Sequence, residues 1–452
     1  MDVKIIGGVA AGMSAAAKLK RNLKEGVTIT VYEKGADLSY GACGMPYFIS
    51  DEIKTEKQLI ARDKAGFEKA GINVRTHHEV IKIDEKNKTL HIKDLNNQQV
   101  KQTPYEKLII ASGASAIRLP INGSTLSGIH SLNSLEDARI LKTKLTSPSI
   151  KTVGVIGASF IGLEMVEVLK TMGKEVHVIE RAKRVLPKYD QEITDVIESH
   201  LKEQGVHVHL NQTVQAYHGK NHVQAIKTDQ GSYEVDFVIE AIGLKPNTDF
   251  CSKAFKKLKN GALIVNENLE TSIKDVYAAG DCVAYPHQLK PKEPSFVPLG
   301  THANKAGRVI ANRLANQDDV FFGVIGSNQL KVMDLEVAMS GLGEQEAIDA
   351  GYDAKAKTIK ALNQAGYYPG AEALVIKLIY EPSTCRLLGG QIVGKKGAAL
   401  RINTLAVALQ NGLRADQLAK LDLAYAPPFA PVWDPLQTAC NQIKCEKKGD
   451  HQ

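Results

Sequence analysis

The sequence predicts an α/β chain with two Rossmann-like dinucleotide-binding domains and a third, C-terminal α+β domain. Two observations carry this prediction. A strand–glycine turn–helix–strand unit that ends in an acidic residue begins at residue 3 and recurs from residue 151. The segment after residue 323 has strand-like and helical stretches but no glycine-rich phosphate turn. At 452 residues the chain is also too long for one hydrophobic core, so two or three domains are expected.

The first unit starts with the apolar run from Val3 to Ile6, which predicts a buried strand. A glycine turn follows at residues 7–12, then a helix-like stretch and a second strand that ends at Glu33. Such glycines let the backbone approach a pyrophosphate at a helix N-terminus, and an acid about 20 residues later reaches a ribose hydroxyl. Val9 replaces the middle glycine of the usual pattern, so the turn taken alone also allows a plain packing role.

The second unit repeats this layout. A strand at residues 151–156 leads into the turn from Gly157 to Gly162, and a later strand ends at Glu180. Here Ser159 replaces the middle glycine. Two such units with their terminal acids are far more specific than one. Two nucleotides on one chain indicate a flavin and a nicotinamide, and therefore electron transfer between them.

Cys43 lies in a stretch of small residues, Ser39 to Tyr47, shortly after the strand of the first unit. Pro46 and Phe48 occupy the positions where a nearby partner cysteine would stand. A redox-active Cys43 would therefore cycle between a thiolate and a mixed disulfide, or a thiolate and a sulfenic acid. The alternative is a small buried apolar side chain, which is the commonest role of a free cysteine.

Composition excludes several classes of protein. The 43% hydrophobic and 24% charged residues are ordinary for a globular chain, and no apolar run approaches the length of a membrane span. The net charge of +7 comes without a basic stripe interleaved with aromatics, so no nucleic acid is expected. The N-terminus enters a strand at once and the six cysteines have no framework spacing, so we expect no signal peptide and a cytoplasmic location. No metal-ligand cluster is expected.

Three later stretches join a buried strand to a small-residue exit, at residues 105–113, 238–247 and 275–282. With the two nucleotide units and Cys43, their order resembles the FAD-dependent pyridine nucleotide-disulfide oxidoreductases over nearly the whole chain. The chain is most similar to the single-cysteine branch, and closest there to the coenzyme A disulfide reductases and the CoA-dependent persulfide or polysulfide reductases.

This resemblance implies FAD on the first unit, with Glu33 at its adenosine ribose and Asp281 at its ribityl chain, and NAD(P)H on the second. It implies an FAD-binding domain at 1–113 and 246–322, an NAD(P)-binding domain at 114–245, and a dimerisation domain at 323–452. The cofactor-binding residues that it implies are Gly7, Gly8, Val9, Ala10, Gly12, Glu33, Lys34, Ser112, Gly113, Gly157, Ile161, Gly162, Glu180, Gly243, Gly280 and Asp281.

The choice between NADH and NADPH stays open. Glu180 favours an unphosphorylated ribose and hence NADH. Arg181 and Arg184 follow closely and offer charges for a 2′-phosphate, although surface arginines are as often simply solvated.

The electron acceptor stays open as well. Ala10 stands where NADH peroxidases and water-forming oxidases of this family carry a histidine. Pro46 and the tyrosine motifs at residues 366–370 and 424–429 are similar to those of the coenzyme A disulfide reductases. The later run from Val432 to Pro435 is more similar to the CoA-dependent sulfur or polysulfide reductases.

In the coenzyme A disulfide reductases, two tyrosines reach the cysteine of the other subunit. The resemblance therefore implies a homodimer with a shared active site, in which Tyr425 and Tyr367, rather than Tyr368, assist the catalytic Cys43. The alternative is that these tyrosines only pack the dimer interface. The CoA-contacting positions implied by the resemblance are Ser14, Lys18, Arg21, Ser39, Lys69 and His302.

The expected function is transfer of electrons from NAD(P)H through FAD and Cys43 to CoA disulfide or to a CoA-dependent persulfide or polysulfide. Two alternatives remain. One is an NADH oxidase that uses oxygen or peroxide through a Cys43 sulfenic acid. The other is a slow-turnover flavin protein that senses redox state or binds a partner.

Overall fold

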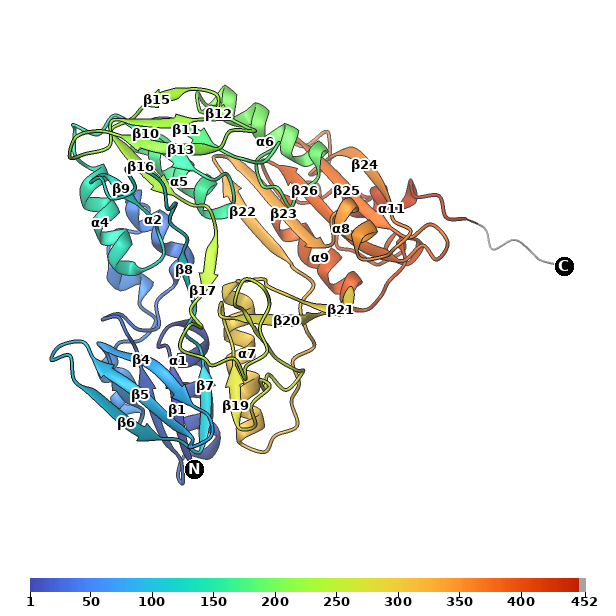
Figure 1. Cartoon of the computed structure of the whole chain (residues 1–452). Helices are drawn as coiled ribbons and strands as arrows, with labels where there is room; N and C mark the ends of the chain where they lie inside the picture. Colours follow the sequence, from blue (N-terminus) through green and yellow to red (C-terminus); the bar gives the residue numbers. More distant parts are fainter. Residues whose placement is uncertain (447–452) are drawn as a thin grey trace. The chain divides into compact units, whose positions relative to one another are not determined.

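The computed structural model describes residues 1–446 (Figure 1). The chain divides into two compact units that alternate along the sequence. Unit 1 comprises Met1–Ile117, Leu132–Leu145 and Gly243–Val324, and unit 2 comprises Arg118–Ser131, Thr146–Ile242 and Ile325–Gln452. The four domain segments predicted from the sequence remain a prediction, and the last six residues of the C-terminal segment, 447–452, lie outside the described residues.

Unit 1 is built on a parallel sheet in the order β19-β7-β1-β2-β3. Its inner strands are apolar and buried on both faces, as expected when helices cover a parallel sheet. The strands are β1 (Asp2–Ile6), β2 (Thr28–Tyr32), β3 (Asn73–Arg75), β7 (Lys107–Ile110) and β19 (Val276–Ala278).

Two long helices of unit 1, α1 (Ala10–Leu23) and α7 (Gly300–Leu314), pack side by side. Their close approach depends on Gly307, because a Cβ there would lie 2.3 Å from the Ala11 carbonyl oxygen. The shorter helices are η1 (Ala42–Gly44), α2 (Met45–Ile49), η2 (Glu56–Leu59), α3 (Lys64–Lys69) and α4 (Leu135–Leu145).

Three small antiparallel or mixed sheets complete unit 1. They contain β4 (His78–Asp84), β5 (Thr89–Asp94) and β6 (Val100–Pro104); β8 (Ala114–Ala116) and β17 (Leu244–Pro246); and β18 (Leu263–Ile264), β20 (Val283–His287) and β21 (Lys290–Ser295).

Unit 2 begins with a second parallel sheet in the order β12-β11-β10-β16-β9, so the two nucleotide units have the same arrangement of central strands. The strands are β9 (Ile129–His130), β10 (Thr152–Ile156), β11 (Glu175–Ile179), β12 (His207–His209) and β16 (Phe237–Glu240). The other elements of this part are α5 (Phe160–Thr171), α6 (Gln191–Glu203), β13 (Val214–His218), β14 (Ala225–Thr228) and β15 (Ser232–Glu234).

No metal-ligand cluster is expected from the sequence, but strand pairing in unit 2 brings together three side chains of types that could ligate a metal. Strands β11 and β12 pair side by side and bring Glu175, His177 and His207 together. About 30 residues separate the two strand segments, so no ligand spacing in the sequence indicates the cluster.

The C-terminal part of unit 2 is an antiparallel sheet in the order β22-β23-β26-β25-β24, with α9 packed on β23 and β26 (Figure 1). Its elements are β22 (Asn328–Val332), β23 (Leu335–Gly341), α8 (Glu344–Asp349), β24 (Lys355–Leu362), β25 (Ala373–Tyr380), β26 (Leu387–Gly394), α9 (Ala398–Gln410), α10 (Ala415–Leu418) and α11 (Pro435–Asn441).

This C-terminal part exposes many large apolar side chains. They include Leu400 and Val407 of α9, Tyr367, Phe429, Val432 and Trp433, each more than half exposed. Exposed apolar side chains that form a contiguous patch occur at protein–protein contacts, among other sites.

Cys385 and Cys445 form a disulfide, with their Cα atoms 5.5 Å apart. The scattered cysteine spacing gave no indication of this pair. Among the described residues, no helix is long and apolar enough to cross a lipid bilayer.

Candidate active site

The first glycine turn joins β1 to α1 in a conformation that only glycine tolerates. Gly7 has φ +100°, and a Cβ at this residue would lie 2.1 Å from the Ala111 carbonyl oxygen. A Cβ at Gly12 would lie 2.0 Å from the Gly7 carbonyl oxygen. Helix α1 starts after Val9 with no side-chain cap, so its first amide groups are available to an anion. The turn therefore suits the pyrophosphate of a dinucleotide.

Glu33 closes this turn from the end of β2. Its Oε2 accepts a hydrogen bond from the Gly8 amide at 2.6 Å, and its Oε1 accepts one from the Gly35 amide at 2.7 Å. The carboxylate is thus held at the sheet edge where a ribose would sit. The neighbouring Lys34 extends to Glu79, with its Nζ 2.7 Å from Oε1.

The second turn, between β10 and α5, repeats these contacts. Gly157 has φ +96°, and a Cβ there would lie 2.5 Å from the Ala241 carbonyl oxygen. Glu180 accepts hydrogen bonds from the Ala158 and Ala182 amides, both at 2.7 Å. Gly162 and Ile161 lie in the first turn of α5, whose N-terminus also has no side-chain cap. Two nucleotide cradles of the same design therefore exist on one chain.

The residues predicted at the flavin's other end lie at the edge of the unit 1 sheet. Asp281 follows Gly280, which has φ +88° and donates its amide to the Tyr285 hydroxyl at 2.7 Å. Burial raises the pKa of the Asp281 carboxyl. Such a partly buried acid needs a hydroxyl or amide partner, which the ribityl chain of a flavin offers.

Ser112 and Gly113 lie where the chain leaves β7. The Ser112 hydroxyl donates to the Asn247 carbonyl at 2.6 Å, and the Asn247 side chain donates back to the Ser112 carbonyl at 3.0 Å. Gly243, with φ +120°, precedes β17, which pairs with β8. These two hydrogen bonds join the segment that follows β7 to the segment that follows β17.

Cys43 lies in η1 and is exposed, and it is not part of a disulfide. Its loop is bonded to the first nucleotide turn, since the Ser39 amide donates to the Gly8 carbonyl at 3.0 Å. The Gly41 amide donates to the Leu59 carbonyl at 2.8 Å, and a Cβ at Gly44 would lie 2.4 Å from a Leu59 methyl. The alternative of a buried structural cysteine is therefore wrong for Cys43.

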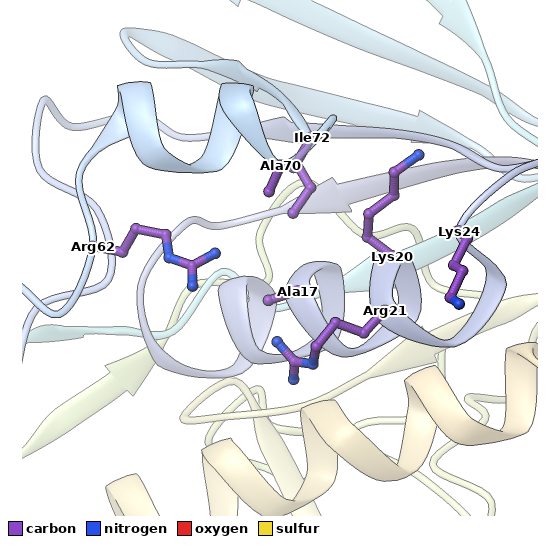
Figure 2. A pocket seen from close by; sticks show the side chains of 7 residues that line it. All are labelled: Ala17, Lys20, Arg21, Lys24, Arg62, Ala70 and Ile72. Carbon is purple, nitrogen blue, oxygen red and sulfur yellow. The ribbon is translucent and has the colours of Figure 1, made fainter.

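A cationic pocket of about 370 Å³ lies beside α1 in unit 1 (Figure 2). Four cations line it, namely Lys20, Arg21, Lys24 and Arg62, with Ala17, Ala70 and Ile72 between them. Figure 2 shows Arg62 extending toward α1 from the loop that precedes α3. Four positive charges around one pocket suit a ligand with several phosphates.

Only part of the predicted CoA set meets at this pocket. Arg21 lines it, while Lys18 does not, and Lys69 ends α3 immediately before Ala70. Sequence reasoning missed Arg62, whose guanidinium also lies 5.2 Å from the Phe67 ring centroid. No pattern in the sequence indicates a loop residue that reaches a helix 40 positions earlier.

Ser14 of α1 and His302 of α7 each have a hydrogen-bond partner in α7 or in the segment just before it. The Ser14 hydroxyl donates to Asn304 Oδ1 at 2.5 Å, and His302 Nδ1 lies 3.2 Å from the Val297 carbonyl oxygen. Burial lowers the pKa of His302, so this ring is neutral at neutral pH and offers no charge to a phosphate.

Tyr367 and Tyr425 meet in unit 2, with their hydroxyl oxygens 2.9 Å apart. Both rings are exposed, at 76% and 43%. The hydrogen bond with Tyr367 raises the pKa of Tyr425, so its hydroxyl keeps its proton at neutral pH. Of the two neighbouring tyrosines, it is Tyr367 and not Tyr368 that pairs with Tyr425.

Two dinucleotide cradles, and one exposed cysteine in a loop hydrogen-bonded to the first of them, fit an oxidoreductase that moves electrons between a nicotinamide, a flavin and a thiol. Comparison with known proteins agrees. Residues 1–305 match the family model for pyridine nucleotide-disulphide oxidoreductases, and residues 327–435 match the dimerisation domain of the same family. The chain belongs to this family, whose members use FAD and NAD(P)H.

Relatives with different names cover almost the whole chain. The NAD(P)H coenzyme A polysulfide/persulfide reductase of Pyrococcus horikoshii is 36% identical over 98% of both chains. An NADH oxidase of Methanocaldococcus jannaschii is 33% identical over 97% of this chain and 98% of its own. A coenzyme A disulfide reductase of Staphylococcus epidermidis is 31% identical over 94% and 96%.

Solved structures give the same result. The NAD-dependent persulfide reductase from A. fulgidus is 37% identical and superposes with a TM-score of 0.93, covering 98% of this chain and 82% of that one. The α/β fold with two nucleotide units and a dimerisation domain is therefore confirmed, and the chain is an NAD(P)H-dependent flavoprotein oxidoreductase.

Proposed function

We propose that this protein reduces CoA disulfide, or a persulfide or polysulfide carried by CoA, with electrons from NAD(P)H that pass through Cys43. The observation that carries this proposal is the exposed Cys43 in a loop bonded to the first nucleotide turn. The names of the relatives from Pyrococcus horikoshii and Staphylococcus epidermidis support the same class of substrate.

The chemistry at Cys43 consists of two steps. The Cys43 thiolate attacks one sulfur of CoA disulfide, which forms a Cys43–CoA mixed disulfide and releases one CoA thiolate. Two electrons and a proton then convert the mixed disulfide into the Cys43 thiolate and a second CoA thiol. The electron pair comes from one NAD(P)H, so the overall reaction consumes one NAD(P)H for each disulfide.

FAD would supply, when bound, the chemistry that links hydride donation by NAD(P)H to reduction of a disulfide. The residues that would hold it are Gly7, Gly12 and the α1 N-terminus for the pyrophosphate, Glu33 for the ribose, and Asp281 for the ribityl chain. The turn from Gly157 to Gly162 and Glu180 would hold the nicotinamide nucleotide in the same way.

The pocket of Lys20, Arg21, Lys24 and Arg62 would bind the phosphates of CoA. Arginine forks match phosphate oxygens in bidentate fashion, and each such contact strengthens anion binding. Arg21 belongs both to this pocket and to the CoA-contacting positions that the resemblance implies, whereas Lys18, Lys69 and His302 lie outside the pocket lining.

We further propose a homodimer in which Tyr367 and Tyr425 of the partner subunit stand beside Cys43. The exposed apolar side chains of the C-terminal part and the dimerisation-domain match support the dimer. The Tyr425 hydroxyl, protonated and bonded to Tyr367, would donate to the leaving CoA thiolate. The cytoplasmic location also stays a proposal.

An NADH oxidase is the second candidate, since the Methanocaldococcus jannaschii relative carries that name and Cys43 is exposed enough to be oxidised to a sulfenic acid. The two candidate functions differ in the group that becomes covalently attached to Cys43. Intact mass of the purified protein under denaturing, non-reducing conditions separates them. A CoA adduct that dithiothreitol removes is expected, whereas a Cys43 that carries oxygen and never CoA would favour the oxidase.

The phosphate pocket has its own test. Replacing Arg21 and Arg62 together with glutamine should raise the KM for CoA disulfide by about 100-fold or more, because each of the two lost charge-assisted contacts costs about 1.5–3 kcal/mol. NAD(P)H oxidation with oxygen should change little. Arg308→Gln, an exposed arginine on α7 outside the pocket, is the matched control. An unchanged KM in the double variant would remove the pocket from the CoA site.

A further inference from the structure

Three histidines and a glutamate gather at one edge of the second parallel sheet, on the two strands that lead to Glu180 and its hydrogen-bond partner His209. Strands β11 and β12 run parallel in a register that pairs His177 with His207 and Ile179 with His209. Side chains paired across parallel strands share a face, and so do residues two positions apart on one strand. Glu175, His177, His207 and His209 therefore lie on one face of this edge.

The distances within the cluster suit one small cation. Glu175 Oε1 lies 3.6 Å from His177 Nε2 and 3.4 Å from His207 Nε2. The ligand atoms of all three residues lie within 4.8 Å of one another. Tetrahedral ligands at about 2.0–2.1 Å from a zinc ion stand about 3.3 Å apart, which is close to the two distances from Glu175 Oε1 to the histidine nitrogens.

Neighbouring groups orient two of these ligands. His209 Nε2 lies 3.1 Å from His177 Nδ1, and a hydrogen bond there leaves His177 Nε2 to face the cluster. The Thr152 hydroxyl donates to Glu175 Oε2 at 3.4 Å, which leaves Oε1 toward the two histidines. The His209 ring in turn packs on Tyr233, with ring centroids 4.1 Å apart. Metal-ligating histidines are usually supported by such a second hydrogen bond.

The cluster is also open enough to admit an ion. The side chains of Glu175 and His207 are 55% and 51% exposed, whereas that of His177 is 16% exposed. The His177 and His207 rings stack with centroids 4.6 Å apart, so His207 would rotate for both nitrogens to point at one ion, and its exposure allows this.

We propose that Glu175, His177 and His207 bind one divalent transition-metal ion of the zinc type, with a water at the fourth position and His209 as a positioning residue. Imidazole nitrogens with one carboxylate select zinc, nickel, cobalt or copper over magnesium and calcium, which prefer oxygen ligands alone. The ion would bridge β12, the edge strand, to β11 and would stabilise this edge.

The test uses the untagged, full-length flavoprotein in a Cys43→Ser background, because an exposed thiolate also binds zinc. Equilibrium dialysis against micromolar ZnCl₂, followed by metal analysis, should give one zinc per chain, and the same dialysis against MgCl₂ should give none. Zinc binding to the native state should also raise the melting temperature. The proposal would be overturned if the protein held no zinc after dialysis, or if it bound magnesium equally well.

Variants assign the ligands. Glu175→Gln and His207→Gln, both at exposed positions that folding tolerates, should each weaken zinc binding by at least 10-fold. His209→Gln should weaken it by about 10- to 100-fold while a stoichiometry of one is kept, as removal of a supporting hydrogen bond does. His218→Gln, on β13, is the matched control and should have no effect. Equal losses in the control and in the ligand variants would contradict the site.

Discussion

Removing one oxygen atom from Tyr425 tests the part of the mechanism that depends on the second subunit. Tyr425→Phe keeps the ring and removes the hydroxyl, which lies 2.9 Å from that of Tyr367. If the ring only packs an interface, the variant should behave as the wild type. If the hydroxyl donates to the leaving CoA thiolate, the variant loses a general acid.

The expected magnitude follows from the setting of the pair. A lost proton donor lowers turnover by about 10- to 10³-fold. The effect on folding should be small, within about 1 kcal/mol, because a hydrogen bond that both partners exchange for water contributes little net stability. In Tyr425→Phe, turnover with CoA disulfide should therefore fall steeply, whereas stability to urea should hardly change.

The assay compares two acceptors. Turnover of NAD(P)H with CoA disulfide should fall, whereas oxygen consumption, which releases no CoA thiolate, should fall much less. Tyr367→Phe and the double variant complete a cycle, and the two losses should not add, since the hydroxyls act as a pair. Tyr368→Phe is the matched control in the same loop. Wild-type kinetics for Tyr425→Phe would refute the acid role and return the proton to Tyr367 or water.

Three further predictions concern residues of unit 2. Glu180→Ala should raise the NADPH-to-NADH ratio of kcat/KM, because it removes a carboxylate that repels a 2′-phosphate, and an unchanged ratio would exclude Glu180 from the ribose site. Burial, with a smaller effect of Glu167, raises the pKa of Glu164 from 4.5 to about 7, so the folded state holds this proton more tightly than the unfolded chain. Stability should fall as the pH rises from about 4.5 to about 7, and Glu164→Gln should remove up to about 3 kcal/mol of that fall in urea titrations; parallel pH profiles would contradict this. Lys377 is 3% exposed and lies beside Asp190, Glu192 and Glu344. Replacing it with alanine should lower the free energy of unfolding by about 3–5 kcal/mol, because three carboxylates lose their cation. The exposed Lys360→Ala on β24 is the control, and an equal loss in both variants would contradict the reasoning.

The nucleotide cradles could be predicted because their chemistry is local. Gly7 and Gly157 need positive φ, and Glu33 and Glu180 stand at the ends of the next strands. Each of these demands is met within about 30 residues of sequence, so the pattern is visible without the fold.

The contacts that sequence reasoning missed depend on distant segments. Arg62 joins the α1 pocket from a loop, and the strand pairing of β11 with β12 assembles Glu175 with His177 and His207. Cys385 meets Cys445 across 60 residues. Such contacts follow from sheet order and loop paths, which residue types and spacing do not encode.

The resemblance to the single-cysteine branch supplied what local chemistry could not. It singled out Tyr367 and Tyr425, 58 positions apart, and their hydroxyls are hydrogen-bonded. Its CoA-contacting positions at Lys18 and Lys69 stay a prediction, and neither residue lines the cationic pocket beside α1.

The central claim is that electrons reach the acceptor through Cys43. The most direct measurement is the kinetics of Cys43→Ser, with flavin reduction by NAD(P)H followed in a single turnover and CoA disulfide reduction followed at steady state. The account predicts that the variant keeps bound FAD and fast flavin reduction but loses CoA disulfide turnover. Near wild-type CoA disulfide turnover in Cys43→Ser would contradict it.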